Sequence, residues 1–260
     1  MTKILAVTNQ KGGVGKTTTT VNLAASLAAA KQRVLLIDLD PQGNATMGSG
    51  IDKRDLLASV YEVLLGSKTI AEARIYSEAG KYDLLPANRN LAGAEIELVD
   101  LDHREMRLRR ALQQVISEYD FVLIDCPPAL NLLTLNGLCA AKSVMIPMQC
   151  EYYALEGLSD LVNTIRKVRV NLNPELQIEG LLRTMFDPRN ALAQQVSDQL
   201  QEHFGNKVYR TVIPRNVRLA EAPSYGVPVL YHDKLSKGTQ AYLALAGELL
   251  NNADQPAATV

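Results

Sequence analysis

The chain has 260 residues, of which 47% are hydrophobic and 21% are charged, and its formal net charge is −1. These are ordinary values for a globular protein, and there is ample apolar material for a core. A nearly neutral chain gives no sign of general nucleic-acid affinity, so any such activity would need a local basic patch.

Strand-like and helix-like segments alternate along the chain. Apolar runs rich in Val, Leu and Ile predict buried strands at 3–9, 33–39, 82–87, 120–126, 143–148, 178–186 and 207–214. Helical periodicity is clearest at 17–32, 151–170 and 189–205. This alternation predicts an α/β fold, doubly wound, with a mostly parallel central sheet flanked by helices.

The absence of linkers predicts the domain organisation, and the absence of signal and membrane-spanning segments predicts the compartment. No linker rich in Pro, Gly or Ser divides the chain, so we predict a single domain over 1–250 and a flexible C-terminal tail over 251–260. Segment 3–9 is too short for a signal peptide, and no apolar run approaches the roughly 20 residues that cross a bilayer. We therefore expect a cytoplasmic protein.

The cysteines do not suggest a disulfide framework or a zinc site. Cys126, Cys139 and Cys150 are odd in number, far apart in sequence and contain no C-x-x-C pair. We expect reduced, buried thiols.

The stretch NQKGGVGKTTTT, residues 9–20, joins the first strand to the first helix. It ends in Gly15-Lys16-Thr17, as a phosphate-binding loop does, but Gln10 stands where the common pattern has glycine, and a second lysine, Lys11, follows. Glycines let backbone N–H groups turn toward phosphate oxygens, and the helix N-terminus adds partial positive charge. Lys16 can reach the β- and γ-phosphates, and Thr17 can offer its hydroxyl to Mg²⁺.

Two further strands end in acidic residues. Asp125 closes the run FVLID, a position at which phosphate-loop enzymes hold magnesium, often through water. Asp38 and Asp40 close the second strand, and by alternation both face one side. A carboxylate there could position a water for attack on the γ-phosphate, and the alternative for Asp40 is a helix cap or a loop hydrogen bond.

The span from Arg183 to Arg218 is locally basic. Its acids are Asp187, Asp198 and Glu202, and its bases are Arg183, Arg189, Lys207, Arg210, Arg215 and Arg218. Basic side chains gathered on one surface bind phosphates without reading sequence. By composition alone a normally solvated surface is favoured. Further basic clusters at 104–110 and 166–169 are interpreted as solvated helix faces.

Four motifs in order resemble one known family. KGGVGKTT, DLDPQGNAT, DCPPAL and IPRNVRLAEAPSYGVPV together resemble the deviant Walker A ATPases of the ParA/Soj type, within the MinD/ParA superfamily of P-loop NTPases. The resemblance covers 1–250, and the early loop suggests the short, chromosomal form. It implies an enzyme that hydrolyses ATP with Mg²⁺ to ADP and phosphate, slowly, in the partition of bacterial chromosomes or plasmids.

The resemblance also implies residue roles. Lys11 matches a signature lysine that reaches the nucleotide of a dimer partner, and Asp40 matches the residue that activates the attacking water, so the catalytic set is Lys11, Lys16 and Asp40. The implied magnesium residues are Thr17, Asp40 and Asp125. The implied nucleotide-binding residues are Lys11, Gly12, Gly13, Val14, Gly15, Lys16, Thr17 and Thr18, with Met185, Pro214 and Asn216 near the adenine.

The same resemblance implies the partners. A homodimer formed with ATP would bind nonspecific DNA of the nucleoid through Arg189 and Arg218. A ParB-type DNA-binding protein, together with DNA, would stimulate hydrolysis and release the ATPase.

Three other classes share the loop. A MinD-like membrane-positioning ATPase should end in a basic amphipathic helix, whereas this chain has no basic residue after Lys237. We therefore expect no membrane partner. Iron–sulfur carriers need clustered cysteine ligands, and Cys126 has no second cysteine close in sequence. A small-molecule ligase or kinase is the third class, for which the sequence identifies no substrate pocket.

Overall fold

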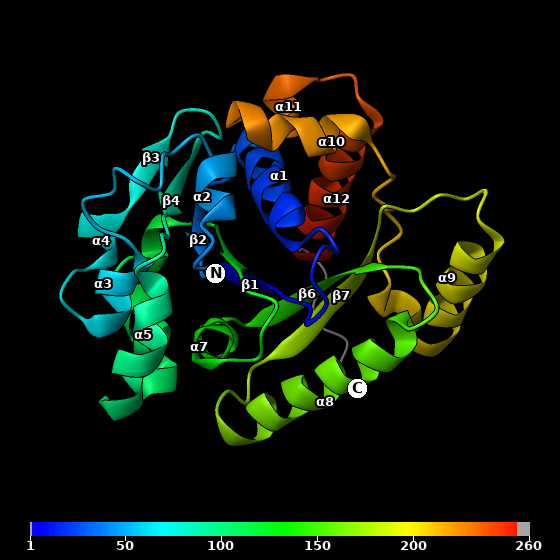
Figure 1. Ribbon diagram of the computed structural model, residues 1–260. Helices are drawn as coiled ribbons and strands as arrows, with labels where there is room; N and C mark the ends of the chain where they lie inside the picture. Colours follow the sequence, from blue (N-terminus) through cyan, green and yellow to red (C-terminus); the bar gives the residue numbers. More distant parts are fainter. Residues whose placement is uncertain (1, 254–260) are drawn as a thin grey trace.

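The computed structural model describes residues 2–253, and within them seven strands form one sheet in the order β3-β4-β2-β5-β1-β6-β7 (Figure 1). All neighbouring strands are parallel except β3 and β4, which are antiparallel. The strands are β1 Lys3–Val7, β2 Val34–Asp38, β3 Ile75–Ser77, β4 Tyr82–Leu85, β5 Phe121–Asp125, β6 Ser143–Gln149 and β7 Gln177–Thr184.

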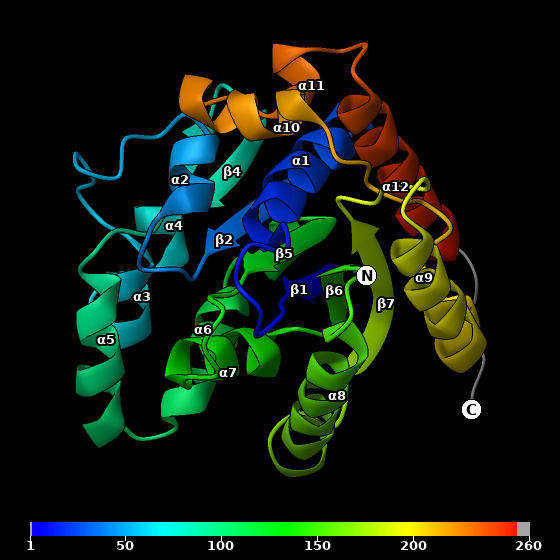
Figure 2. The same ribbon diagram turned by 45° about the vertical axis from the view of Figure 1, so that its right-hand side comes forward.

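Helices cover both faces of this sheet (Figure 2). The α-helices are α1 Lys16–Ala29, α2 Asn44–Gly48, α3 Val60–Leu65, α4 Ile70–Ala73, α5 Leu91–Glu97, α6 Arg107–Leu112, α7 Leu132–Ala140, α8 Ala154–Asn171, α9 Ala191–Phe204, α10 Val217–Glu221, α11 Val229–His232 and α12 Lys237–Ala253. The predicted α/β class, doubly wound with a mostly parallel sheet, is confirmed.

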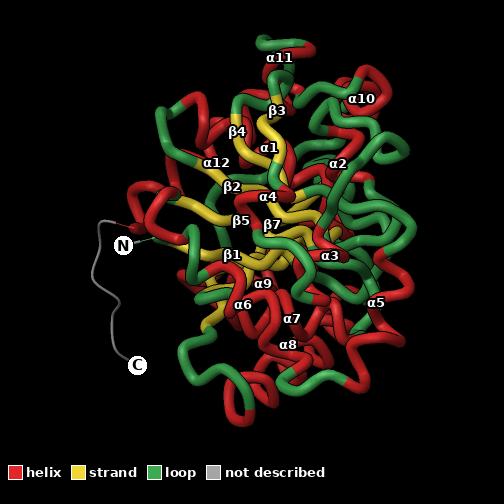
Figure 3. The backbone as a smooth tube through the Cα atoms, turned by 90° about the vertical axis from the view of Figure 1, so that its left-hand side faces the viewer, coloured by secondary structure: helices red, strands yellow, loops and turns green. Residues whose placement is uncertain are grey.

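The two faces of the sheet bury two separate apolar clusters. Along β1, Ile4 and Ala6 pack with α3 to α9, whereas Leu5 and Val7 pack with α1 and α12. Because side chains alternate along a strand, a strand buried on both faces needs apolar residues at every position, which explains the continuous Val, Leu and Ile runs. Figure 3 shows the strands between these two layers of helices.

The predicted strand at 207–214 is wrong. This segment makes only isolated bridges, Leu181 with Val208 and Phe186 with Pro214. A proline has no N–H to donate to a strand ladder, and the Arg183 guanidinium takes the carbonyl oxygens of Tyr209 and Arg210 at 2.8 and 3.3 Å. The structure adds one strand that was not predicted, the short antiparallel edge strand β3, which has only three residues.

Helix α12 runs through Ala253, three residues into the predicted tail, and the rest of that tail prediction lies outside the described residues. In the part of the chain that the structure describes, no helix has both the length and the apolarity to cross a membrane.

Candidate functional site

The carboxyl ends of three neighbouring strands meet beneath one loop. In the sheet register Val7 of β1 lies beside Asp125 of β5, and Asp125 lies beside Asp38 of β2. The glycine-rich loop, residues 8–15, leaves β1 at this edge and leads into α1. In open parallel sheets, ligands bind at the carboxyl ends of the strands, so this edge is the candidate site.

The glycine-rich loop is tied to neighbouring strands by side chains. Asn9 accepts a hydrogen bond from the Lys11 N–H at 3.0 Å and donates to the Pro147 carbonyl of β6 at 2.8 Å. Thr184, at the end of β7, donates to the Val14 carbonyl at 2.7 Å. The bonds to Pro147 and from Thr184 tie the two ends of the loop to β6 and β7.

The loop conformation requires its glycines. Gly13 and Gly15 have φ angles of 72° and 89°, a region that favours glycine. A methyl group placed on Gly12 or Gly13 would meet no atom within 4 Å, so open space faces the loop. Among the described residues, no side chain caps α1 at Gly15, which leaves the first N–H groups of this helix available to an anion.

Lys16 is buried inside the loop it closes. Its ammonium donates to the Lys11 carbonyl at 3.1 Å. Burial lowers the pKa of Lys16 because it disfavours the charged form, and the nearby carboxylates of Asp125 and Asp40 oppose that shift. The ammonium therefore contacts the loop backbone and lies near the acidic residues at the strand ends, and its contact with phosphate stays a prediction.

Two hydroxyl groups at the start of α1 donate hydrogen bonds to the carboxylate of Asp125. Thr17 donates to one carboxylate oxygen at 2.8 Å, and Thr20 donates to the other at 3.0 Å. Burial, and then the charge of Asp38, raise the pKa of Asp125. The structure thus brings the predicted magnesium residues Thr17 and Asp125 into direct contact.

Asp38, the last residue of β2, and Asp40, two residues beyond it, have different surroundings. Asp38 is fully buried and accepts from the Thr46 N–H and hydroxyl, both at 2.8 Å, and burial raises its pKa. Asp40 is only partly buried, and one of its oxygens accepts from the Gln42 N–H at 2.9 Å. Asp38 therefore holds the following loop, whereas among the described residues no hydrogen bond engages the second carboxylate oxygen of Asp40.

Lys11 stands at the outer edge of the loop. Its ammonium forms an ion pair with Glu151, which follows β6, and both side chains are about half exposed, at 50% and 51%. Beside Glu151, Tyr152 and Tyr153 are 73% and 71% exposed and pack edge to face. The sequence reasoning missed these three residues, although the pair of tyrosines after a strand end was a visible signal.

The residues predicted near the adenine lie on two adjoining segments. Met185 directly follows β7, has a φ of 49°, and its sulfur accepts from Gln149 at 2.8 Å. Pro214 forms an isolated β-bridge with Phe186, the residue that follows Met185. Asn216 caps α10 by accepting from the Arg218 N–H at 3.0 Å. Met185 is thus brought to the glycine-rich loop, since its methyl group lies 3.9 Å from where a Gly15 Cβ would stand.

A cavity lies at the start of α1, directly after the glycine-rich loop. This cavity of about 430 Å³ lies between the first turns of α1, helix α2 and segment 222–227, with Thr17 and Thr18 in its wall. None of the three predicted adenine residues lines this cavity. Their role as adenine contacts stays a prediction.

Several arginines of the basic span from Arg183 to Arg218 already form ion pairs or hydrogen bonds with other residues of the chain. Arg189 pairs with Asp187 at 2.7 Å, and Arg218 pairs with Glu221 at 2.8 Å and with Asp233 at 3.3 Å. Arg183 is only half-buried, but its guanidinium is engaged by Ser197 and by the 209–210 backbone. Its inclusion in the basic patch is therefore corrected, because a β7 side chain there faces α9.

The cysteines are free and buried, as expected. Burial raises the pKa of the Cys139 and Cys150 thiols to about 11, and it raises that of Cys126 still further. Among residues 2–253, no three His, Cys, Asp or Glu side chains gather as a metal-binding group.

Comparison with known proteins identifies the family. The family described as AAA domain matches residues 2–178. The sporulation initiation inhibitor protein Soj of Bacillus subtilis is 55% identical over 97% of this chain and 100% of its own. The chromosome partitioning protein ParA of Myxococcus xanthus is 53% identical over 95% of this chain and 88% of its own.

A solved structure extends the likeness to three dimensions. The crystal structure of cobyrinic acid a,c-diamide synthase from Mycobacterium smegmatis, with bound ADP and magnesium, is 40% identical. It covers 98% of this chain and 96% of its own, with a TM-score of 0.86. Together with the loop, the strand-end aspartates and the fold, these matches place the chain in the ParA/Soj family of the MinD/ParA superfamily.

Proposed function

We propose that this protein is a partition ATPase that hydrolyses ATP to ADP and phosphate and so drives chromosome or plasmid segregation. The observation that carries the proposal is the meeting of Lys16, Thr17 and Asp125 at the glycine-rich loop, with a second lysine, Lys11, at its outer edge. Relatives more than half identical that carry a chromosome-partitioning name support the biological role.

The site suits a nucleotide phosphate chain. The open space before Gly12 and Gly13 and the uncapped start of α1 provide N–H donors, and Lys16 supplies a buried cation. In the proposal the phosphates lie along residues 11–18. Met185, Pro214 and Asn216 contact the adenine.

The site also suits Mg²⁺. This ion takes oxygen ligands and keeps several waters, so one hydroxyl and one carboxylate beside substrate phosphates are sufficient. The Thr17 hydroxyl and an Asp125 carboxylate oxygen, 2.8 Å apart, offer that pair, and Asp40 follows the neighbouring strand by two residues. When bound, the ion would neutralise charge that develops on the phosphate oxygens.

Asp40 is the proposed positioning group for the attacking water. Asp40 is partly buried two residues after β2, and within residues 2–253 only one of its carboxylate oxygens is engaged, by the Gln42 N–H. Asp38 is unsuited to the task because Thr46 and the Asp40 N–H occupy its oxygens. Without further cations at the transition state, turnover by a single chain should be slow.

A homodimer formed with ATP is the proposed source of a further cation. Lys11 is half exposed and pairs with Glu151, the residue before the exposed Tyr152 and Tyr153. Exposed tyrosines are enriched at protein interfaces. In this proposal Lys11 breaks its ion pair with Glu151 and binds the phosphates of the ATP held by the partner subunit. The nucleotide then becomes part of the contact between subunits.

The dimer is the proposed DNA-binding species, with Arg189 and Arg218 as phosphate contacts on the nucleoid. Both side chains are exposed, and their acidic neighbours can be replaced by DNA phosphates because exposed ion pairs contribute little. Doubling the contacts on dimerisation strengthens binding steeply, since phosphate contacts act together. A ParB-type protein is the proposed partner that stimulates hydrolysis.

The membrane-positioning alternative receives no support from the C-terminal helix. Within the described part of α12, residues 237–253, Lys237 is the only basic residue. A helix that binds anionic lipid needs several basic residues along one face.

Steady-state ATP hydrolysis, measured alone, with DNA, and with DNA plus a cognate ParB-type protein, tests the proposal. We expect low activity alone and the highest activity with both additions. Equal rates under all three conditions would contradict the partition role. Vesicle co-sedimentation of the ATP-bound protein would favour the membrane alternative instead.

A further inference from the structure

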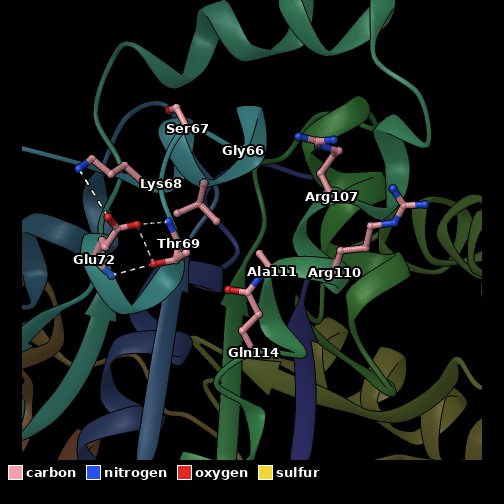
Figure 4. A pocket seen from close by; sticks show the side chains of 10 residues that line it. Gly66, Ser67, Lys68, Thr69, Glu72, Arg107, Arg110, Ala111 and Gln114 are labelled. Carbon is pink, nitrogen blue, oxygen red and sulfur yellow. Dashed lines mark hydrogen bonds and ion pairs between the residues drawn. The ribbon is translucent and has the colours of Figure 1, made fainter.

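A basic pocket lies on the face of the sheet opposite α1. It has a volume of about 260 Å³ and is bounded by the end of α3, the start of α4 and helix α6 (Figure 4). Helices α3 and α6 pack in the apolar cluster on that face, through Val63, Leu108 and Leu112. None of the proposed nucleotide or DNA residues lines this pocket.

The wall of this pocket carries unmatched positive charge. Its charged side chains are Lys68, Arg107, Arg110 and Glu72. Glu72 is already engaged by the Thr69 N–H and hydroxyl, both at 2.8 Å, and Figure 4 shows Lys68 turned toward it. Within residues 2–253, neither Arg107 nor Arg110 forms an ion pair with a carboxylate. Two positive charges are therefore left over.

Arg107 is held in place before any ligand binds. It donates to the carbonyl oxygens of Leu64 and Leu65 at 2.9 and 3.0 Å. These bonds supply hydrogen-bond donors to carbonyl groups in the last turn of α3. Gly66 makes this possible, because a Cβ there would lie 2.6 Å from the Arg107 guanidinium. The remaining N–H groups of this guanidinium stay available, and a side chain fixed in advance loses little entropy on binding.

The available donors suit a phosphoryl group. Arg107 and Arg110 are three residues apart on α6, so they share one face of the helix. Guanidinium forks bind phosphate oxygens in pairs, and a phosphate monoester carries about −1.5 to −2 charges at pH 7, which matches the two unmatched cations. We propose that this pocket binds the phosphoryl group of a small soluble ligand through Arg107 and Arg110.

Residue-resolved NMR of the full-length chain, labelled with ¹⁵N-arginine, tests this site. The probes are inorganic phosphate and glycerol phosphate, each titrated to about 50 mM, a range that captures millimolar affinity. We expect saturable shifts of the Arg107 and Arg110 Nε–H signals with both probes. Signals from the glycine-rich loop do not interfere, because each arginine is read separately.

Two matched variants separate a specific site from general charge. Arg110→Gln should weaken binding about threefold to tenfold, since it removes one charge-assisted contact. Arg109→Gln removes the same charge from the same helix, but Arg109 lines a different, smaller cavity, so binding should be unchanged. Both side chains lie at least partly in solvent, and each variant should fold.

Three results would overturn the proposal. They are unshifted arginine signals at the highest probe concentration, equal weakening in the two variants, and shifts that occur only with a short DNA duplex. The last result would make this face a DNA surface rather than a small-ligand site.

Discussion

The ammonium group of Lys11 forms an ion pair with the carboxylate of Glu151 in the same chain, although Lys11 is the residue proposed to reach a second subunit. Both side chains are about half exposed. Exposed pairs of this kind contribute only about 0–1 kcal/mol, so a polyphosphate can displace Glu151 without a large cost. In the proposed mechanism, Lys11 therefore stays paired with Glu151 until a polyphosphate displaces it.

Replacing Lys11 by Ala should abolish ATP-dependent dimerisation while leaving part of the ATP affinity, because Lys16 still serves the nucleotide of its own chain. Sedimentation velocity with ATP and Mg²⁺ measures the outcome. Lys167→Ala, which removes an exposed lysine from α8, is the matched control and should dimerise normally. A stable ATP dimer of the Lys11 variant would refute the role in trans.

Replacing Glu151 by Gln should promote dimerisation. The change keeps the size of the side chain but removes the charge that holds Lys11. Given the small energy of a half-exposed pair, the ATP concentration at half-maximal dimer should fall about twofold to fivefold. A rise in that concentration would mean that Glu151 instead supports the dimer interface.

Replacing Asp40 by Ala should slow hydrolysis by about 100-fold or more, the size expected for loss of a group that positions or deprotonates the nucleophile. ATP binding should persist because Lys16 and Thr17 are untouched, and the ATP dimer should accumulate. Single-turnover hydrolysis and sedimentation measure the two effects. Hydrolysis at the unmodified rate would remove Asp40 from the mechanism.

Replacing Arg218 or Arg189 by Glu should weaken DNA retention in the presence of ATP. Loss of each phosphate contact should lower the slope of log affinity against log salt by about one. Arg54→Glu is a matched control, because Arg54 pairs with Asp52 as Arg189 pairs with Asp187, two residues apart. The control should retain DNA fully. Equal losses in all three variants would indicate a general charge effect.

Replacing Asn22 by Ala should lower the free energy of unfolding by about 1–3 kcal/mol, since the buried Val229 N–H loses its partner. Asn22 donates to the Thr18 carbonyl and accepts from the Val229 N–H, both at 2.7 Å, and so joins α1 to α11. Denaturant unfolding measures the change. Asn171→Ala removes one exposed helix bond, to the Lys167 carbonyl, and should change the stability by less than about 0.5 kcal/mol.

Local patterns predicted much of the fold because they depend on neighbours in sequence. Apolar runs located six strands, and the turn residues at 9–17 located the glycine-rich loop. The failure at 207–214 has a different origin: the run is apolar enough for a strand, but Arg183 occupies carbonyls that a neighbouring strand would have used. The edge strand β3 has only three residues, too few to show a period.

The sequence by itself determined the chemistry available at the site: the two lysines of the loop, the threonine after them and the aspartates at the strand ends. Only the tertiary structure decided which of these groups touch. It placed Thr17 on Asp125, turned Asp38 inward to Thr46, paired Lys11 with Glu151 and directed Arg183 toward Ser197. The reason is that such contacts join residues up to 140 positions apart, and the sheet order that brings them together is not written in any local pattern.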